Sequence, residues 1–350
     1  MTISVYEKLA DALDRLPNGF TRTSSKVEIE ILRRFFTEDE AAIACTMGRD
    51  LEPSVKIAKR MGFTEEEAEG RLNEMTSRGL LWSQTKDDER LFRLAPFVVG
   101  IYEAQLDAMD HGLAHLIEEY FASGGATGIM GHEPAIHRII PAHGAVKSEW
   151  IMPYDDVKTI LQRMKTFNVR RCICRVQQDY IGRKCSFPID ICLNFSSRKR
   201  SLREGDISKE EALAMLDRAE DLGLVHTVSN VMQGFGYVCN CCGCCCGILR
   251  GITEWGVENS VAHANYYSEI EKELCIGCGL CEARCQVKAI SMEAGRASVN
   301  RSRCVGCGLC STKCPSGAAK LVKKHESEIV SPPIDFEEWE KQRLINRGLK

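Results

Sequence analysis

The spacing of apolar residues predicts a mostly helical N-terminal third of the chain. Apolar residues recur at helical intervals over residues 27–36, and short helices are expected over 53–61 and 65–78, where glycines and a capping box set the ends. Two apolar runs, residues 80–85 and 90–94, flank a charged turn and predict a β-hairpin. The N-terminal third is therefore expected to contain three helices followed by a hairpin.

This element order is that of a winged helix, so a DNA-binding function has to be weighed. Residues 26–93 contain 12 basic and 15 acidic residues. The helix predicted over residues 65–78, which would be the recognition helix, carries five glutamates against two arginines. Phosphate neutralisation supplies much of the affinity for DNA, so a groove-binding helix needs the opposite charge. We expect no nucleic-acid partner, and a protein-docking or structural role for this domain.

The middle of the chain combines helix and strand patterns. Apolar stripes predict helices within residues 106–121 and 154–167. A further helix is expected to begin after Ser208, which starts a capping box, and to end at Gly223. The apolar run over residues 224–228 then predicts a strand.

The histidines of this region make weak metal-site candidates. His111 and His115 lie four residues apart but lack the glutamate of a zinc-protease motif. His132, His137 and His143 fall in a stretch that is expected to form a loop. We expect packed or solvated side chains at these positions.

Residues 326–350 contain no cysteine and combine charge with large apolar groups. A pair of prolines precedes Asp335, which is expected to cap a helix. On that helix Phe336, Trp339 and Leu344 require burial. They either pack on the chain's own core or dock on a partner subunit, where aromatic anchors are frequent hot spots.

Composition narrows the class of protein. The chain has 350 residues, 46 basic and 49 acidic, which predicts no general attraction to nucleic acid or membranes. No apolar run reaches the ~20 residues of a membrane span, and the N-terminus lacks the pattern of a secretion signal. The 19 cysteines gather in groups within a long chain, which is typical of metal sites rather than of a secreted disulfide scaffold. We expect a cytoplasmic protein without a membrane span.

Two copies of one cysteine spacing lie within residues 275–314. Each is the C-x2-C-x2-C-x3-C run of a two-cluster bacterial ferredoxin, in which the fourth cysteine of each run binds the other [4Fe–4S] cluster. One cluster is therefore predicted on Cys275, Cys278, Cys281 and Cys314, and the other on Cys304, Cys307, Cys310 and Cys285. Zinc knuckles are the alternative, but two complete runs are far rarer by chance than isolated C-x2-C pairs. Gln286 stands where the first run usually carries a proline.

Ten further cysteines lie within residues 172–246. The first four have the spacing C-x-C-x10-C-x6-C and supply the number of thiolates that a [4Fe–4S] cube or a structural zinc ion needs. The other six fall within eight residues, more than one cube can bind. The first group is Cys172, Cys174, Cys185 and Cys192, and the second is Cys239, Cys241, Cys242, Cys244, Cys245 and Cys246.

Iron–sulfur ligation, zinc ligation and inert core thiols all stay open for the first group. The density of thiolates close to a ferredoxin run favours iron. At least four thiolates of the second group are expected to bind a cluster, but the spacing does not say which four. A larger or non-cubane cluster shared by both groups is a further alternative. We expect one or two further iron–sulfur clusters in residues 172–246.

Taken together, these motifs resemble a family of large iron–sulfur electron-transfer proteins of anaerobic bacteria and archaea. The likeness covers residues 20–325 and rests on residues 94–102, 172–175 and 239–247 and on the two ferredoxin runs. It implies an α+β multidomain chain that transfers low-potential electrons within a larger redox system. The expected parts are a winged-helix-like domain (1–100), an α/β cysteine-rich cluster-binding domain (101–262), a two-cluster ferredoxin domain (263–325) and a tail (326–350) that is a possible docking helix.

The favoured function is a polyferredoxin that relays single electrons to or from a partner oxidoreductase. No catalytic acid, base or nucleophile set is found, and neither a complete G-x-G-x-x-G nor a P-loop supports nicotinamide, flavin or ATP binding. The chain is therefore not expected to be an enzyme on its own. A hetero-oligomer is expected and a homodimer stays open. The alternatives are a redox enzyme component whose middle cluster reduces a substrate, and an iron–sulfur-sensing transcription regulator.

Overall fold

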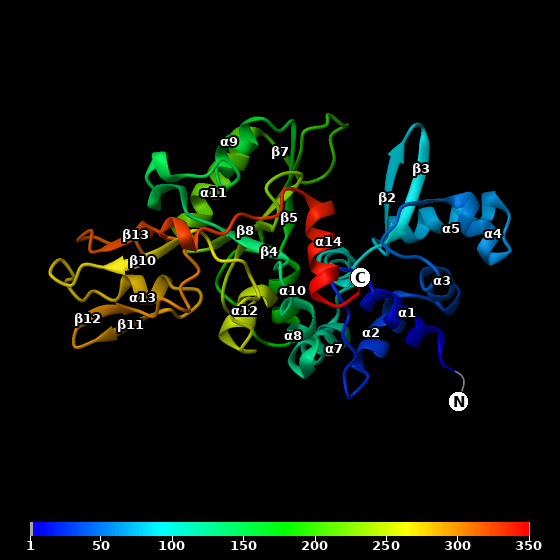
Figure 1. Ribbon diagram of the computed structural model, residues 1–350, viewed down its shortest axis with the longest axis horizontal. Coiled ribbons are helices and arrows are strands. Elements are labelled where there is room, and N and C mark those ends of the chain that lie inside the picture. The colour runs from blue at the N-terminus through cyan, green and yellow to red at the C-terminus, as the bar shows by residue number, and fades with distance from the viewer. Residues whose placement is uncertain (1–2, 350) are drawn as a thin grey trace. The chain divides into compact units, whose positions relative to one another are not determined.

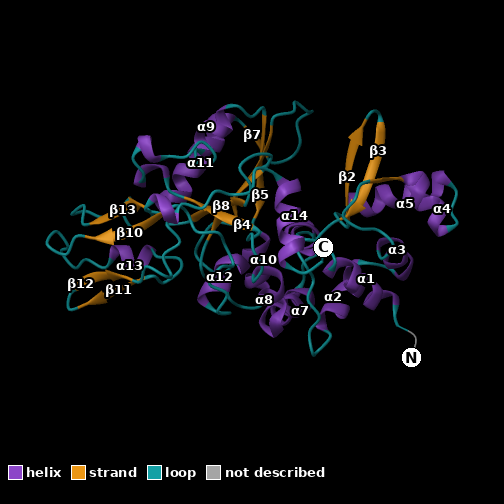
Figure 2. Ribbon diagram, in the orientation of Figure 1, coloured by secondary structure: helices purple, strands orange, loops and turns teal. Residues whose placement is uncertain are grey.

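A computed structural model describes residues 3–349, and Figure 1 follows them along the chain. The described residues form a mixture of helices and strands of the α+β class (Figure 2). They divide into two compact units. Unit 1 contains the chain up to His132, Val176–Gly182 and the chain from Glu340 onward; unit 2 contains Glu133–Arg175 and Arg183–Trp339. No helix among the described residues is long and apolar enough to cross a membrane.

Unit 1 is mainly helical. Its helices are α1 (Val5–Asp14), α2 (Val27–Phe35), α3 (Glu38–Ala44), α4 (Ser54–Met61), α5 (Glu65–Ser77), α6 (Tyr102–Ala104), α7 (His111–Tyr120) and α8 (Ala126–Met130). Its strands β1 (Glu52–Pro53), β2 (Leu81–Lys86) and β3 (Glu89–Leu94) form one antiparallel sheet in the order β1-β3-β2. The buried rings of Phe20, Phe97 and Tyr120 lie with centroids 4.7 to 5.5 Å apart and mark its core.

The local signals in unit 1 lead to elements at the predicted residues. Thr64 and Glu67 form the capping box at the start of α5, and β2 and β3 pair as a hairpin. Helix α3 was not predicted, although Thr37 and Glu40 give it a capping box of the same kind. The helix expected within residues 106–121 is shorter than its apolar stripe, because Asp110 caps it and it begins at His111.

Unit 2 is built on a six-stranded sheet with the order β4-β8-β9-β6-β5-β7 and antiparallel pairing throughout. Its strands are β4 (His137–Ile140), β5 (Thr166–Arg171), β6 (Asp190–Ser196), β7 (Asp206–Ile207), β8 (Val225–Ser229) and β9 (Tyr237–Cys241). Helices α9 (Val157–Gln162), α11 (Lys209–Leu222), α12 (Gly247–Thr253) and the first residues of α10 (Ile173–Tyr180) accompany it. Ser208 and Gly223 bound α11 as predicted.

The same unit also contains the two ferredoxin runs, which lie between two small antiparallel sheets. Strand β10 (Tyr266–Ile270) pairs with β13 (Ala319–Lys323), and β11 (Ile290–Glu293) pairs with β12 (Arg296–Val299). Helix α13 (Leu280–Arg284) lies within the first run, where it carries Cys281 and is followed by Cys285. The ferredoxin segment and the cysteine-rich sheet share this compact unit.

Two expectations for unit 2 need correction. His137 does not lie in a loop but begins β4, where it is buried and pairs with Ser229 of β8. The stripe over residues 154–167 is not one helix, because α9 ends at Gln162 and β5 starts at Thr166. Apolar periodicity alone cannot separate a short helix from an adjoining buried strand.

The tail packs on its own chain. Helix α14 (Phe336–Asn346) begins after Asp335, whose carboxylate accepts from the backbone N–H of Glu338 at 3.0 Å. In unit 2 the Trp339 indole donates to the carbonyl of Ala135 at 3.0 Å. In unit 1 the fully buried Arg343 donates to the carbonyls of Pro17 (2.7 Å), Ile129 and His132. Of the two fates open from the sequence, burial in the chain's own units is the one observed for Trp339 and Leu344.

Candidate metal centres

Two cavities in the ferredoxin segment are each lined by four cysteines. The first, of about 320 Å³, is lined by Cys275, Cys278, Cys281 and Cys314. The second, of about 340 Å³, is lined by Cys285, Cys304, Cys307 and Cys310. Each cavity thus takes three thiols from one run and the fourth from the other. Four convergent thiols are the ligand set of a [4Fe–4S] cube.

Backbone groups shape both cavities. Gly277 and Gly306 have φ values of 72° and 74°, and a Cβ at either position would lie 2.3 Å from a backbone carbonyl oxygen. These positions therefore require glycine. The amides of Ala289, Ala297 and Ala319 lie 3.1 Å from Cys285, 3.5 Å from Cys275 and 3.3 Å from Cys314 respectively. Amide donors favour the thiolate form, so they prepare the sulfurs to bind metal.

Burial raises the pKa of thiols in both cavities, including that of Cys281 in the first. A hydrogen bond from the Ala297 amide lowers the pKa of the Cys275 thiol below its ordinary value. Burial raises the pKa of Cys310 to about 11, and it also raises the pKa of Cys307. Cys278 of the first cavity is exposed, whereas all four thiols of the second cavity are partly or fully buried. A metal must replace the thiol protons there, since buried thiolates need a cation.

The ten middle cysteines separate into two sets that cut across the sequence groups. Four sulfurs all lie within 4.8 Å of one another, and we call them the four-cysteine set: Cys185, Cys242, Cys244 and Cys245. Each of the other six thiols has its pKa shifted by two neighbouring thiols, and we call them the six-cysteine ring, in the closed order Cys172, Cys174, Cys246, Cys241, Cys239 and Cys192. The ring draws three thiols from each sequence group.

The sheet of unit 2 brings the ring together. Strands β5, β6 and β9 are neighbours, with Arg170 opposite Cys192 and Leu193 opposite Val238. Cys172 directly follows β5, Cys192 lies in β6, and Cys239 and Cys241 lie in β9. The remaining two thiols come from the first turn of α10 and from the N-cap of α12. Strand pairing therefore joins cysteines that are far apart in sequence.

Thiols this close together cannot all ionise without a cation. Hydrogen bonds from Cys174 and Cys192 hold the pKa of the Cys172 thiol well below its ordinary value, whereas the bond to Cys172 raises the pKa of Cys174. The one thiolate and its protonated neighbours share the available protons. Metal ions would take the place of those protons.

Arg175 lies beside both sets and is itself buried. Its guanidinium donates to the carbonyls of Pro188 at 2.9 Å and Asn240 at 2.8 Å. Burial alone would lower its pKa, but the charge of Cys172 and a hydrogen bond to Cys242 raise it above the ordinary value. A guanidinium that stays charged next to thiolates compensates part of their negative charge.

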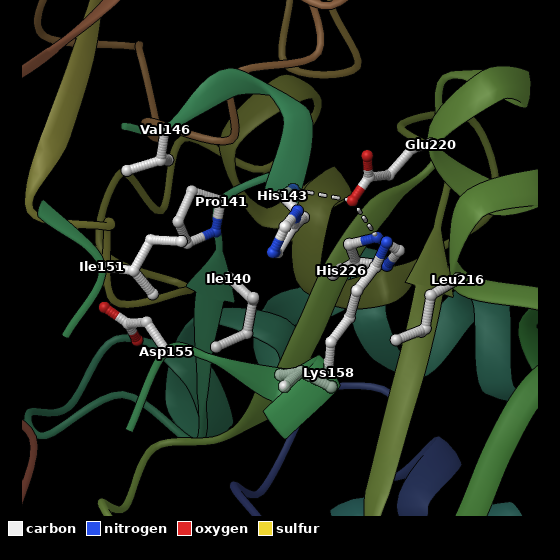
Figure 3. Close-up of a pocket in the computed structure, with 11 residues that line it drawn as sticks. Ile140, Pro141, His143, Val146, Ile151, Asp155, Lys158, Leu216, Glu220 and His226 are labelled. Atoms are coloured by element: carbon white, nitrogen blue, oxygen red, sulfur yellow. Dashed lines mark hydrogen bonds and ion pairs between the residues drawn. The ribbon is translucent and has the colours of Figure 1, made fainter. Parts of the chain in front are cut away.

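A further cavity of about 350 Å³ lies beside β8, where His226 lines it, and no cysteine lines it (Figure 3). Glu220 accepts a hydrogen bond from the backbone N–H of His143 at 2.7 Å and lies 3.4 Å from the ring of His226. The other ring nitrogen of His226 lies 2.6 Å from the side-chain oxygen of Asn240, which stands between two ring cysteines. His226 is a hydrogen-bonded core histidine. It connects this cavity with β9, the strand that carries Cys239 and Cys241.

Sequence comparison agrees with the geometry of the ferredoxin segment. Residues 268–321 match the family described as a 4Fe-4S dicluster domain, and these residues include all eight cysteines of the two cavities. No curated protein and no solved structure matches the chain. The matched domain and the clustered middle cysteines thus identify an iron–sulfur protein of the electron-transfer type with a ferredoxin-type domain near its C-terminus.

Proposed function

We propose that the chain is a polyferredoxin, in which the six-cysteine ring and the two ferredoxin cavities hold iron–sulfur clusters that form one relay. Such clusters each accept and release single electrons. The observation that carries the proposal is the set of direct contacts between the ferredoxin segment and the cysteine-rich sheet, both within unit 2. The protein residues at these contacts fix the spacing and the path between the sites.

Gln286 makes the most informative of these contacts. Its side-chain carbonyl accepts from the Gly243 amide at 2.8 Å, and its NH₂ donates to the carbonyl of Gly223 at 2.8 Å. Gln286 directly follows Cys285 of the second cavity, and Gly243 lies between Cys242 and Cys244. A proline, usual at this position of a ferredoxin run, could make neither bond. The glutamine thus supplies a short bonded path from the second cavity to the middle cysteines.

Arg284 anchors the same junction. It donates to the carbonyls of Glu220 at 2.7 Å and Asp221 at 2.9 Å at the end of α11, and to the carbonyl of Leu309 at 3.0 Å in the second run. Cations near a helix C-terminus interact favourably with the helix dipole. One side chain therefore fixes the second cavity to the helix that packs beside the cysteine-rich sheet, which supports a rigid relay.

The opposite end of the relay faces solvent. Cys278 of the first cavity is exposed, and the neighbouring Leu274, Ile276 and Leu280 are 45%, 68% and 46% exposed. Exposed apolar side chains around a redox site favour contact with another protein. We infer that a partner oxidoreductase exchanges electrons here, within an anaerobic, cytoplasmic hetero-oligomeric complex. Unit 1 has a winged-helix-like order of elements, but all five glutamates on α5 are exposed and would repel the phosphates of DNA. We therefore propose a structural or docking role for unit 1.

The alternative of substrate reduction in the middle domain has one observation in its favour. The cavity beside β8 contains Glu220 and His226, and Asn240 connects His226 with the strand of Cys239 and Cys241. A carboxylate and an imidazole in one cavity can bind a polar substrate or move a proton. No described thiol lines that cavity, so the relay remains the favoured function.

The relay is tested by metal content and by electron-transfer kinetics. Anaerobically purified protein is expected to hold more than the roughly eight irons of two cubes, with matching inorganic sulfide. Flash reduction should then show electrons passing between ferredoxin and middle clusters, as separate EPR or absorbance changes. In the Gln286→Ala variant this transfer should slow several-fold with the iron content unchanged. The exposed Gln162→Ala change is the control. About eight irons, or an unchanged rate in the variant, would contradict the proposed relay.

A further inference from the structure

We propose that the four-cysteine set of Cys185, Cys242, Cys244 and Cys245 binds a single thiophilic metal ion, separate from every iron–sulfur cluster of the chain. This inference rests on the geometry and the surroundings of the four thiols and holds whether or not the chain relays electrons. It divides the ten middle cysteines into six for a cluster and four for one ion.

The distances between the sulfurs carry the argument. All four sulfurs lie within 4.8 Å of one another, and those of Cys244 and Cys245 are 3.7 Å apart. A tetrahedral ion with metal–sulfur bonds of about 2.3 Å places its four sulfurs about 3.8 Å apart. A cube binds each thiolate to a different iron and so needs more widely separated sulfurs. Among the described residues, the ferredoxin cysteines form no group as close as this one.

The local fold explains how four thiols meet so closely. Three of them come from the tight turn between β9 and α12, and Cys185 comes from the segment between α10 and β6. Gly243 occupies the turn between Cys242 and Cys244, where a Cβ would lie 1.8 Å from the carbonyl oxygen of Gln286. The turn can therefore fit against the ferredoxin segment only with glycine at this position.

The surroundings suit a tetrathiolate ion. Cys242 and Cys245 are 1% and 2% exposed and pack with Ile191, Ala219 and Leu224. A divalent ion with four thiolates carries a net charge of −2, and the buried guanidinium of Arg175, which donates to the carbonyl of Asn240 two residues before Cys242, can compensate part of that charge. Soft thiolates in tetrahedral arrangement select zinc or iron over magnesium or calcium. The ion would tie the α10–β6 segment to the turn that precedes Cys246 of the ring.

The test measures metal and inorganic sulfide together in full-length protein. Wild-type protein should hold one metal ion per chain beyond the iron that its sulfide accounts for. Zinc in the elemental analysis identifies a zinc site, and excess iron with a mononuclear high-spin EPR signal identifies an iron site. In Cys185→Ser this ion should be lost while sulfide stays at the wild-type level. Cys45→Ser, a cysteine of unit 1 outside all sets, should change neither quantity.

A second variant, Cys244→Ser, provides the test if Cys185→Ser fails to fold. Cys244 is the exposed member of the set, so Cys244→Ser should fold and should still lose the ion. Added Co²⁺ should give the visible ligand-field bands of tetrahedral thiolate cobalt in metal-depleted wild-type protein and not in Cys244→Ser. Loss of sulfide together with iron in both variants would overturn the proposal, because the set would then belong to a cluster. Wild-type protein with no extra ion and no cobalt bands would do the same.

Discussion

Replacing Cys314 by serine is expected to remove the metal from the cavity that Cys275, Cys278 and Cys281 share with it, and to leave the second cavity filled. The loss should amount to about four irons and four sulfides per chain, the content of one cube. The physical reason is that Cys314, although it ends the second run, lines the first cavity. Iron and sulfide analysis with EPR of the reduced protein measures the loss.

Paired substitutions decide which cavity each cysteine serves. Cys275→Ser combined with Cys314→Ser should cost no more iron than either change alone, because both act on one site. Cys304→Ser combined with Cys314→Ser should remove both cubes. Cys285→Ser is the reciprocal control, since it should spare the first cavity. If the first pair removed twice the iron of Cys314→Ser, the crossed assignment would be wrong.

Replacing Arg343 by methionine is expected to destabilise unit 1 by about 3 kcal/mol or more, since each buried acceptor left unpaired costs about 1–3 kcal/mol. Arg343 is fully buried, and it donates to the carbonyls of Pro17, Ile129 and His132. Methionine fills similar space but donates nothing. Urea unfolding measures the change in the free energy of unfolding. Hydrogen exchange of the α8 amides shows whether that change lies in unit 1. Unit 2 clusters should be retained.

Glu337→Ala on the same helix is the matched control. Glu337 is exposed in the first turn of α14, so its loss should change stability by less than about 0.5 kcal/mol. Arg343→Lys, which keeps the charge and three donors, should fall between the two. Equal unfolding midpoints for Arg343→Met and Glu337→Ala would show that the buried contacts of the tail contribute nothing to the stability of unit 1.

Local signals were sufficient for much of the fold. Capping boxes at Thr64 and Ser208 and the left-handed Gly223 placed α5 and α11 because those interactions act within a few residues of sequence. The crossing pattern of the two runs predicts which cysteines share a cluster, and the four cysteines of each predicted set line one cavity. The ligand assignment itself stays a prediction. Helix α3 was missed although its capping box was readable at Thr37.

The sequence did not indicate which of the ten middle cysteines lie together in the fold. Cys185 is close in sequence to Cys174 and Cys192, yet its sulfur meets Cys242, Cys244 and Cys245. That grouping depends on the pairing of β6 with β9, and spacing within one segment contains no information about such long-range pairing. Gln286 had a signal in the sequence, a departure from the usual proline, but its partners Gly223 and Gly243 became visible only in three dimensions.

Unit 1 combines segments from both ends of the described chain, so it cannot be completed until the residues from Glu340 onward have been synthesised. Domains at the N-terminus generally fold first as the chain leaves the ribosome. Here the carbonyls of Pro17, Ile129 and His132 accept hydrogen bonds from Arg343, which follows each of them by more than 200 residues. The cysteines of the six-cysteine ring have all emerged by residue 246, and the first ferredoxin cavity is complete at Cys314. The cysteines of the ring and of the first cavity are therefore all synthesised before Arg343, so metal can enter unit 2 before these contacts of unit 1 form.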